Sequence, residues 1–171
     1  MTGDEANRGP KDRLTAAAAL VDRARTAQEP GRAVQAMVEI ARAAEAFDWD
    51  LGRADAASTA ATLRAMVAHD RELFDWAVLV ATDLLYRDDP YYVVEALLAR
   101  SGYQVLRELG AAADSRLDPG HLADADAEMA DVIEERGLGA LVTENRPRSV
   151  PPSHTWWFVP SSDPEPRSGQ V

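Results

Sequence analysis

Hydrophobic residues recur along most of this 171-residue chain with the period of an α-helix. They are spaced three and four positions apart, which places them on one face of a helix. A clear example is the stripe formed by Leu14, Ala17, Ala18, Val21 and Ala24. The alternation typical of a β-strand does not occur before residue 140. The pattern therefore predicts an all-α domain.

Proline and aspartate residues indicate where these helices begin and end. The Glu29-Pro30 step ends the first helix, because proline disfavours the α conformation in the residue before it. Asp89-Pro90 and Asp118-Pro119 each place an N-cap aspartate before a proline in the first turn, and so predict two further helix starts. Gly137 and Gly139 end the last helix. We expect five to seven helices, arranged as a helical bundle or as stacked α-hairpins.

One charged residue interrupts the apolar stripe of residues 55–86, for which Asp55 is the predicted N-cap. Burial of a carboxylate is costly, so we expect a break at His69-Asp70, with Asp70 capping a separate helix. That helix, which contains Trp76, is apolar on nearly all sides and is expected to be the central, most buried one. Ser101-Gly102 is a second point at which a helix can divide.

The composition changes abruptly after Val142. Residues 145–171 hold six of the ten prolines together with serine, arginine and acidic residues, which is typical of a disordered tail. We therefore divide the chain into a disordered leader (1–10), a helical domain (11–142) and a proline-rich tail (143–171).

An aromatic segment, Trp156-Trp157-Phe158, lies within this tail. Left in water, it would expose roughly several hundred Å² of apolar surface. In one interpretation it docks in a groove of its own helical domain. In the other it is a linear motif whose aromatic side chains anchor a partner protein. Both interpretations hold if the tail docks on its own domain and is released when a partner binds.

The charge of the chain narrows the classes of partner. The net charge is −11 and the only lysine is Lys11, which argues against direct binding to nucleic acid. The longest strongly apolar stretch, residues 76–86, is shorter than the roughly 20 residues of a membrane-spanning helix. The N-terminus has no signal-peptide pattern, so we expect a cytoplasmic protein. An acidic chain of this kind favours a basic protein partner.

Carboxylates concentrate in the predicted last helix. Asp124, Glu128, Asp131 and Glu135 follow the spacing i, i+4, i+7, i+11 and so share one face. Like charges at such spacings cost about a few tenths of a kcal/mol per pair. The face therefore needs solvent, cations or a basic partner. Calcium is disfavoured, because Met129 occupies the position where an EF-hand loop needs glycine.

Arg64 and His69 are separated by four residues. This six-residue segment resembles the arginine–histidine motif of HEPN ribonucleases, a helical family. The resemblance implies an alternative function, in which Arg64 and His69 act together on an RNA phosphodiester.

Other catalytic signatures are missing from the sequence. The chain has no cysteine, no glycine-rich phosphate loop and no nucleophile elbow, and its three histidines lie in separate segments. We therefore expect no metal or other cofactor, and a non-enzymatic adaptor, accessory or regulatory protein, an inhibitor or immunity-type protein included. Its partner would contact Trp156, Trp157, Phe158, Asp124, Glu128, Asp131 and Glu135. The alanine-rich first two helices could also pack against a second copy.

Overall fold

The computed structural model describes residues 9–27, 29–109 and 119–158. Within these ranges the fold is all-α, as predicted, and contains no strand. Its α-helices are α1 (Pro10–Ala27), α2 (Pro30–Glu45), α3 (Ala57–Ala81), α4 (Tyr91–Leu109), α5 (Pro119–Glu135) and α6 (Gly139–Asn145). Short 3-10 helices are η1 (Ala54–Ala56), η2 (Thr82–Tyr86) and η4 (Thr155–Trp157).

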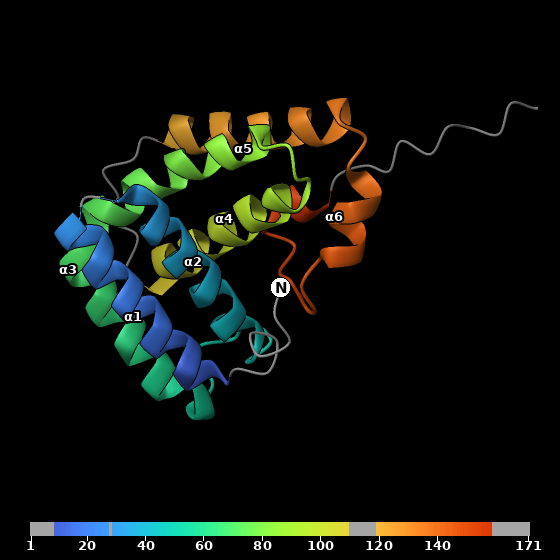
Figure 1. Cartoon of the computed structure of the whole chain (residues 1–171). Helices are drawn as coiled ribbons and strands as arrows, with labels where there is room; N and C mark the ends of the chain where they lie inside the picture. Colours follow the sequence, from blue (N-terminus) through green and yellow to red (C-terminus); the bar gives the residue numbers. More distant parts are fainter. Residues whose placement is uncertain (1–8, 28, 110–118, 159–171) are drawn as a thin grey trace, which may run out of the picture.

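Helix α4 lies at the centre of the molecule (Figure 1). The hairpin of α1 and α2 packs on one side of it through α2, and α3 contacts both α2 and α4. Helix α5 packs against η2, α4 and η4. The prediction that residues 70–86 form the most buried helix is wrong, because Trp76 and Leu79 on that segment are exposed, whereas α4 is buried along most of its length.

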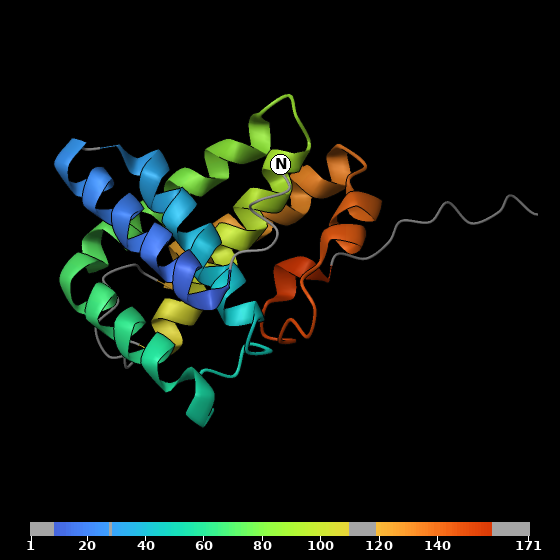
Figure 2. The same ribbon diagram turned by 60° about the horizontal axis from the view of Figure 1, so that its bottom comes forward.

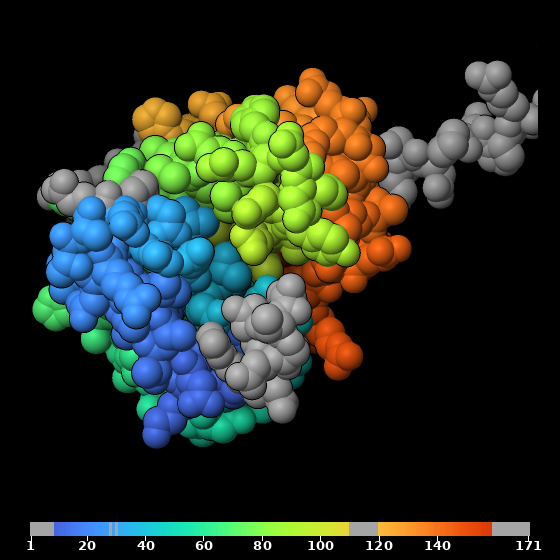
Figure 3. Space-filling view, in the orientation of Figure 1, coloured from blue at the N-terminus to red at the C-terminus, as the bar shows by residue number. Residues whose placement is uncertain are grey.

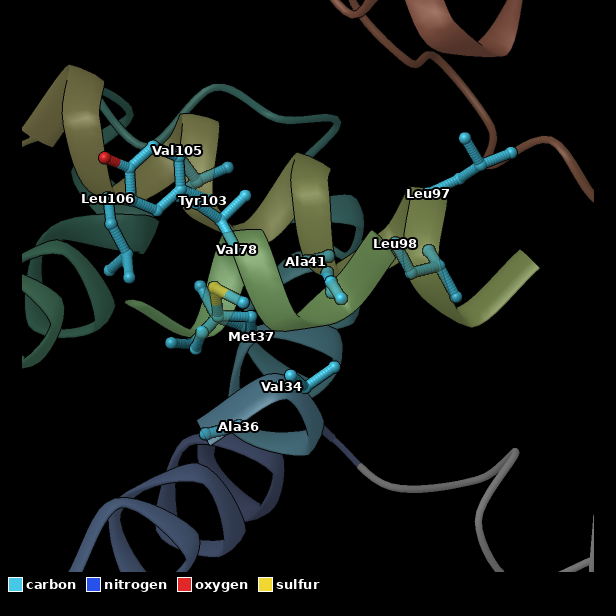
Figure 4. Close-up of a cluster of buried hydrophobic side chains, with 14 of the residues drawn as sticks. Val34, Ala36, Met37, Ala41, Val78, Leu97, Leu98, Tyr103, Val105 and Leu106 are labelled. Carbon is cyan, nitrogen blue, oxygen red and sulfur yellow. The ribbon is translucent and has the colours of Figure 1, made fainter. Parts of the chain in front are cut away.

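The contact between α2 and α4 depends on a glycine. A Cβ atom at Gly102 would overlap the backbone carbonyl of Met37, so only glycine allows the two helices to approach this closely. Helix α4 continues through Ser101-Gly102, and the predicted division there is therefore wrong. Figure 4 shows side chains of α2, α3 and α4 in this part of the core, among them Val78 and Leu106.

Helix α3 is kinked at Asp70, whose backbone angles (φ −126°, ψ 22°) are not helical. The predicted break is thus confirmed, and the Asp70 side chain also forms an ion pair that the sequence did not predict. Its carboxylate is buried and accepts hydrogen bonds from Arg25 of α1, at 2.6 and 2.8 Å from Nη2 and 3.0 Å from Nε. The ion pair offsets the cost of burying the carboxylate and ties α1 to α3.

The predicted helix ends are confirmed in part. Asp89 accepts a hydrogen bond from the Tyr91 backbone N–H at 2.9 Å, which confirms its capping role. Asp55 lies within η1 and pairs with Arg53 at 2.9 Å, so its predicted capping role is wrong. Gly137 adopts a positive φ of 65° just after α5, as the end of a helix requires. Asp118 lies outside the described residues.

The chain continues beyond α5 in an unexpected way. The domain boundary predicted at residue 142 falls inside α6, and residues 146–158, here called the C-terminal strap, run back over the helical domain (Figure 2). Among the described helices, none has the length and apolarity to cross a membrane.

Candidate functional site

The two tryptophans of the strap are buried against the strap's own domain. Trp156 and Trp157 expose 5% and 1% of their surface. Both indole N–H groups donate hydrogen bonds to the Oγ atom of Ser101 on α4, at 3.0 and 2.9 Å. A buried indole needs such an acceptor, and one hydroxyl supplies it to both. Of the two interpretations of this segment, docking on its own domain describes the structure.

His154 of the strap is buried between aromatic rings. It stacks on Trp156, with the ring centroids 4.9 Å apart, and meets the edge of Trp49 at 5.1 Å. Trp49 in turn donates a hydrogen bond from its indole to the backbone carbonyl of Arg148 at 2.9 Å. Neither ring nitrogen of His154 has a hydrogen-bond partner in the described part of the chain. Burial, with a smaller contribution from the charge of Arg100, lowers the pKa of His154 to about 4.

Arg100 of α4 joins the strap to α5. Its guanidinium lies 4.1 Å from the ring centroid of Trp156, a cation–π contact. The same group, only 4% exposed, makes a bidentate ion pair with Asp126 of α5, at 2.7 and 3.0 Å. The buried guanidinium of Arg100 on α4 therefore contacts both the strap and α5.

The acidic residues predicted on one face of α5 have two kinds of environment. Asp124, Asp131 and Glu135 are exposed, and none has a hydrogen bond or ion pair to another described residue. Glu128 is half-buried and accepts a hydrogen bond from the Tyr86 hydroxyl at 2.7 Å. This hydrogen bond raises the pKa of Tyr86, and so do partial burial of the phenol and the nearby carboxylates.

Phe158 was predicted to act with the two tryptophans, whereas Asp126 was not among the predicted site residues. Phe158 is 45% exposed, with the guanidinium of Arg146 5.0 Å from its ring centroid. The sequence did indicate that a carboxylate partner was needed, because Arg100 stands in an apolar run and a buried arginine requires a carboxylate, but it did not identify Asp126 as that partner.

Arg64 and His69, the residues of the ribonuclease resemblance, are both exposed on α3. Five helical positions turn the second residue roughly 140° from the first, so the two side chains leave different sides of the helix. An open pocket of about 830 Å³ lies elsewhere, along α1, α2, α4, α6 and the start of the strap. It contains neither residue.

That pocket combines exposed tyrosines with charges of both signs. The tyrosines are Tyr91 and Tyr92. The charged residues that line it are Arg13, Arg42, Arg146, Arg148, Glu45, Asp89, Glu95 and Glu144. Four cations and four carboxylates cancel, so the pocket favours neither an anion nor a cation.

In the described ranges, no group of three or more histidine and acidic residues could hold a metal ion. Comparisons with protein-family models, with curated proteins and with solved structures find no match for this chain. Function is therefore inferred from the residues and their geometry.

Proposed function

We propose that the chain is a non-enzymatic interaction module, of adaptor, regulatory or inhibitor type, that binds a basic partner protein through α5. The observation that carries this proposal is the acidic face, defined as Asp124, Glu128, Asp131 and Glu135. Three of these four carboxylates are exposed and unpaired among the described residues. Opposite charge on a partner would accelerate association and favour the correct orientation.

The charge arrangement of α5 is unfavourable for the isolated helix. Glu134 and Glu135 lie in its last turn, which contains no basic residue, and negative charge there opposes the helix dipole. Each such charge costs about 0.3–1 kcal/mol at low salt, in addition to the repulsion along the acidic face. A bound cationic surface would relieve both costs, which supports a basic partner.

The acidic face is also presented rigidly. Leu122, Met129 and Ile133 are buried on the opposite side of α5, and Asp126 is fixed by Arg100. A surface that is ordered before binding loses less conformational entropy when the partner arrives. The geometry is thus suited to a docking role.

The role of Trp156, Trp157 and Phe158 as partner anchors stays a prediction. Both tryptophans would reach a partner only after release of the strap, whereas Phe158 is accessible as it stands. In the proposed function the docked tryptophans instead support α5 through Arg100.

The proposal can be tested with a fluorescently labelled peptide of arginine and glycine, which carries charge without apolar side chains. Asp131→Asn combined with Glu135→Gln should weaken its binding about tenfold at low salt. Asp12→Asn combined with Glu144→Gln makes the same change in net charge at exposed sites outside α5. Fluorescence anisotropy measures both affinities. Equal losses in the two variants would mean that only net charge matters and would contradict the proposal.

A further inference from the structure

The second half of α3 and the following η2 helix expose apolar side chains on one side. Trp76 is 45% exposed, Leu79 38% and Tyr86 65%. Their positions, i, i+3 and i+10, follow one helical face, here called the apolar stripe. The other side of the same segment is packed into the core through Phe74, Val78 and other buried residues. The same outward face also carries the exposed carboxylates of Glu72 and Asp83, so the apolar stripe is interspersed with negative charge.

The apolar stripe is continuous with the acidic face of α5. The hydrogen bond from the Tyr86 hydroxyl to Glu128 joins the two surfaces. Asp131 and Glu135 are close enough to contribute to the raised pKa of Tyr86. Helix α5 packs directly against η2, and Figure 3 shows the second half of α3 on the upper surface, with α5 along the edge behind it.

A single exposed apolar residue is ordinary on a protein surface. Here a tryptophan, a leucine and a tyrosine share one helical face and border a row of carboxylates. Tryptophan and tyrosine are the residues most often found as anchors in protein interfaces. The combination is that of a docking surface with an apolar centre and a charged rim.

The negative charge of the acidic face determines which class of partner can bind beside the apolar stripe. A phosphate backbone or an anionic membrane would be repelled by the carboxylates of α5. A second copy of this acidic chain would bring like charge against the same rim. A basic segment is attracted, and it must also offer apolar side chains to cover Trp76 and Leu79. An amphipathic helix carries both on one element.

We propose that the partner contacts this chain through a basic amphipathic helix, whose apolar side covers the apolar stripe while its arginine and lysine side chains bind the acidic face. This inference rests on the proposed function and adds the structural class of the partner segment. Basic charge supplies steering and orientation, and the apolar stripe supplies the anchors.

Synthetic peptides separate the contribution of basic charge from the contribution of the apolar stripe. One peptide of about 18 residues places leucine at i, i+3, i+4 and i+7 among arginines, and a second has the same composition in scrambled order. The full-length protein should bind the amphipathic peptide about tenfold more tightly than the scrambled one. Trp76→Ser combined with Leu79→Ser should abolish that preference, whereas Tyr91→Ser combined with Tyr92→Ser, at equally exposed sites on α4, should preserve it.

Tryptophan fluorescence gives a second readout. Trp76 is exposed, whereas Trp49, Trp156 and Trp157 are buried, so acrylamide should quench chiefly Trp76. The amphipathic peptide should protect it from quenching. Equal affinity for both peptides, or an unchanged preference in the Trp76→Ser, Leu79→Ser variant, would overturn the inference while leaving charge-dependent binding intact. Failure to bind either peptide at low salt would overturn the inference and the proposed function together.

Discussion

At the scale of single residues, the interior of this protein depends on polar side chains that serve more than one partner. The Ser101 hydroxyl accepts hydrogen bonds from both indoles of the strap. The Arg100 guanidinium pairs with Asp126 and also lies over the ring of Trp156. Loss of such a residue leaves several buried groups unsatisfied at once, which costs more than the loss of one hydrogen bond.

Ser101→Ala should therefore lower the free energy of unfolding by about 2 kcal/mol or more, because two buried indole N–H groups lose their acceptor. Ser153→Ala, at an exposed serine of the strap itself, is the matched control and should change stability little. Urea unfolding followed by tryptophan fluorescence measures both. A Ser101→Ala variant as stable as the control would show that the indoles find other acceptors.

Residue-level prediction from the sequence succeeded where the signal was local. Asp89 caps α4 because its side chain bonds to a backbone group two residues away. Gly102 was misread as a helix break, since its close approach to Met37 becomes visible only when α2 and α4 are packed together. Asp70 was recognised as costly to bury, but its partner Arg25 lies 45 positions away.

At the scale of elements, α5 is held by a buried ion pair on one side and presents unpaired charge on the other. Asp124 and Asp126 differ by two positions, and their environments are opposite. The first is exposed, whereas the second pairs with Arg100 under the strap. The periodic pattern could group the exposed acids, but it could not identify which acid turns inward, because that depends on the position of α4.

Asp126→Ala should destabilise the protein by about 3–5 kcal/mol, because it leaves the charge of Arg100 buried without a partner. Asp124→Ala should be neutral or slightly stabilising, since it removes a like charge from the acidic face. Thermal unfolding followed by circular dichroism distinguishes the two. Similar effects of both substitutions would mean that Arg100 is solvated rather than paired.

At the scale of the whole molecule, the strap closes the fold by linking distant parts of the chain. It contacts Trp49 after α2, Arg100 and Ser101 on α4, and, through Arg100, the acidic helix α5. The sequence predicted the helical class and the aromatic segment, and left its docking on the domain as one of two alternatives. Choosing between them required the positions of Trp49, Arg100 and Ser101, which come together only when the chain is folded.

The stability of the closed fold should depend on pH through His154. Its pKa is about 4 in the fold and about 6.5 without burial, so between these values the unfolded chain binds more protons than the native protein. Stability is therefore greatest above pH 6.5 and falls as the pH decreases toward 4, by up to about 3 kcal/mol.

Urea unfolding at several pH values between 7.5 and 4 tests this dependence. His154→Phe should remove the part of the slope that comes from the imidazole, whereas His121→Gln, at an exposed histidine, should retain the wild-type slope. The comparison between variants also cancels the titration of the many carboxylates. Identical slopes in His154→Phe and wild type would show that water reaches the imidazole in the folded state.

The docked tryptophans have a consequence for how the protein is made. A ribosome releases the N-terminal residues first, so α1 to α5 emerge before the strap. During that interval Ser101 and Trp49 lack the strap residues that contact them in the folded protein. The nascent chain thus leaves these contact positions uncovered until the strap is synthesised, and the speed of translation sets how long they are accessible to other proteins.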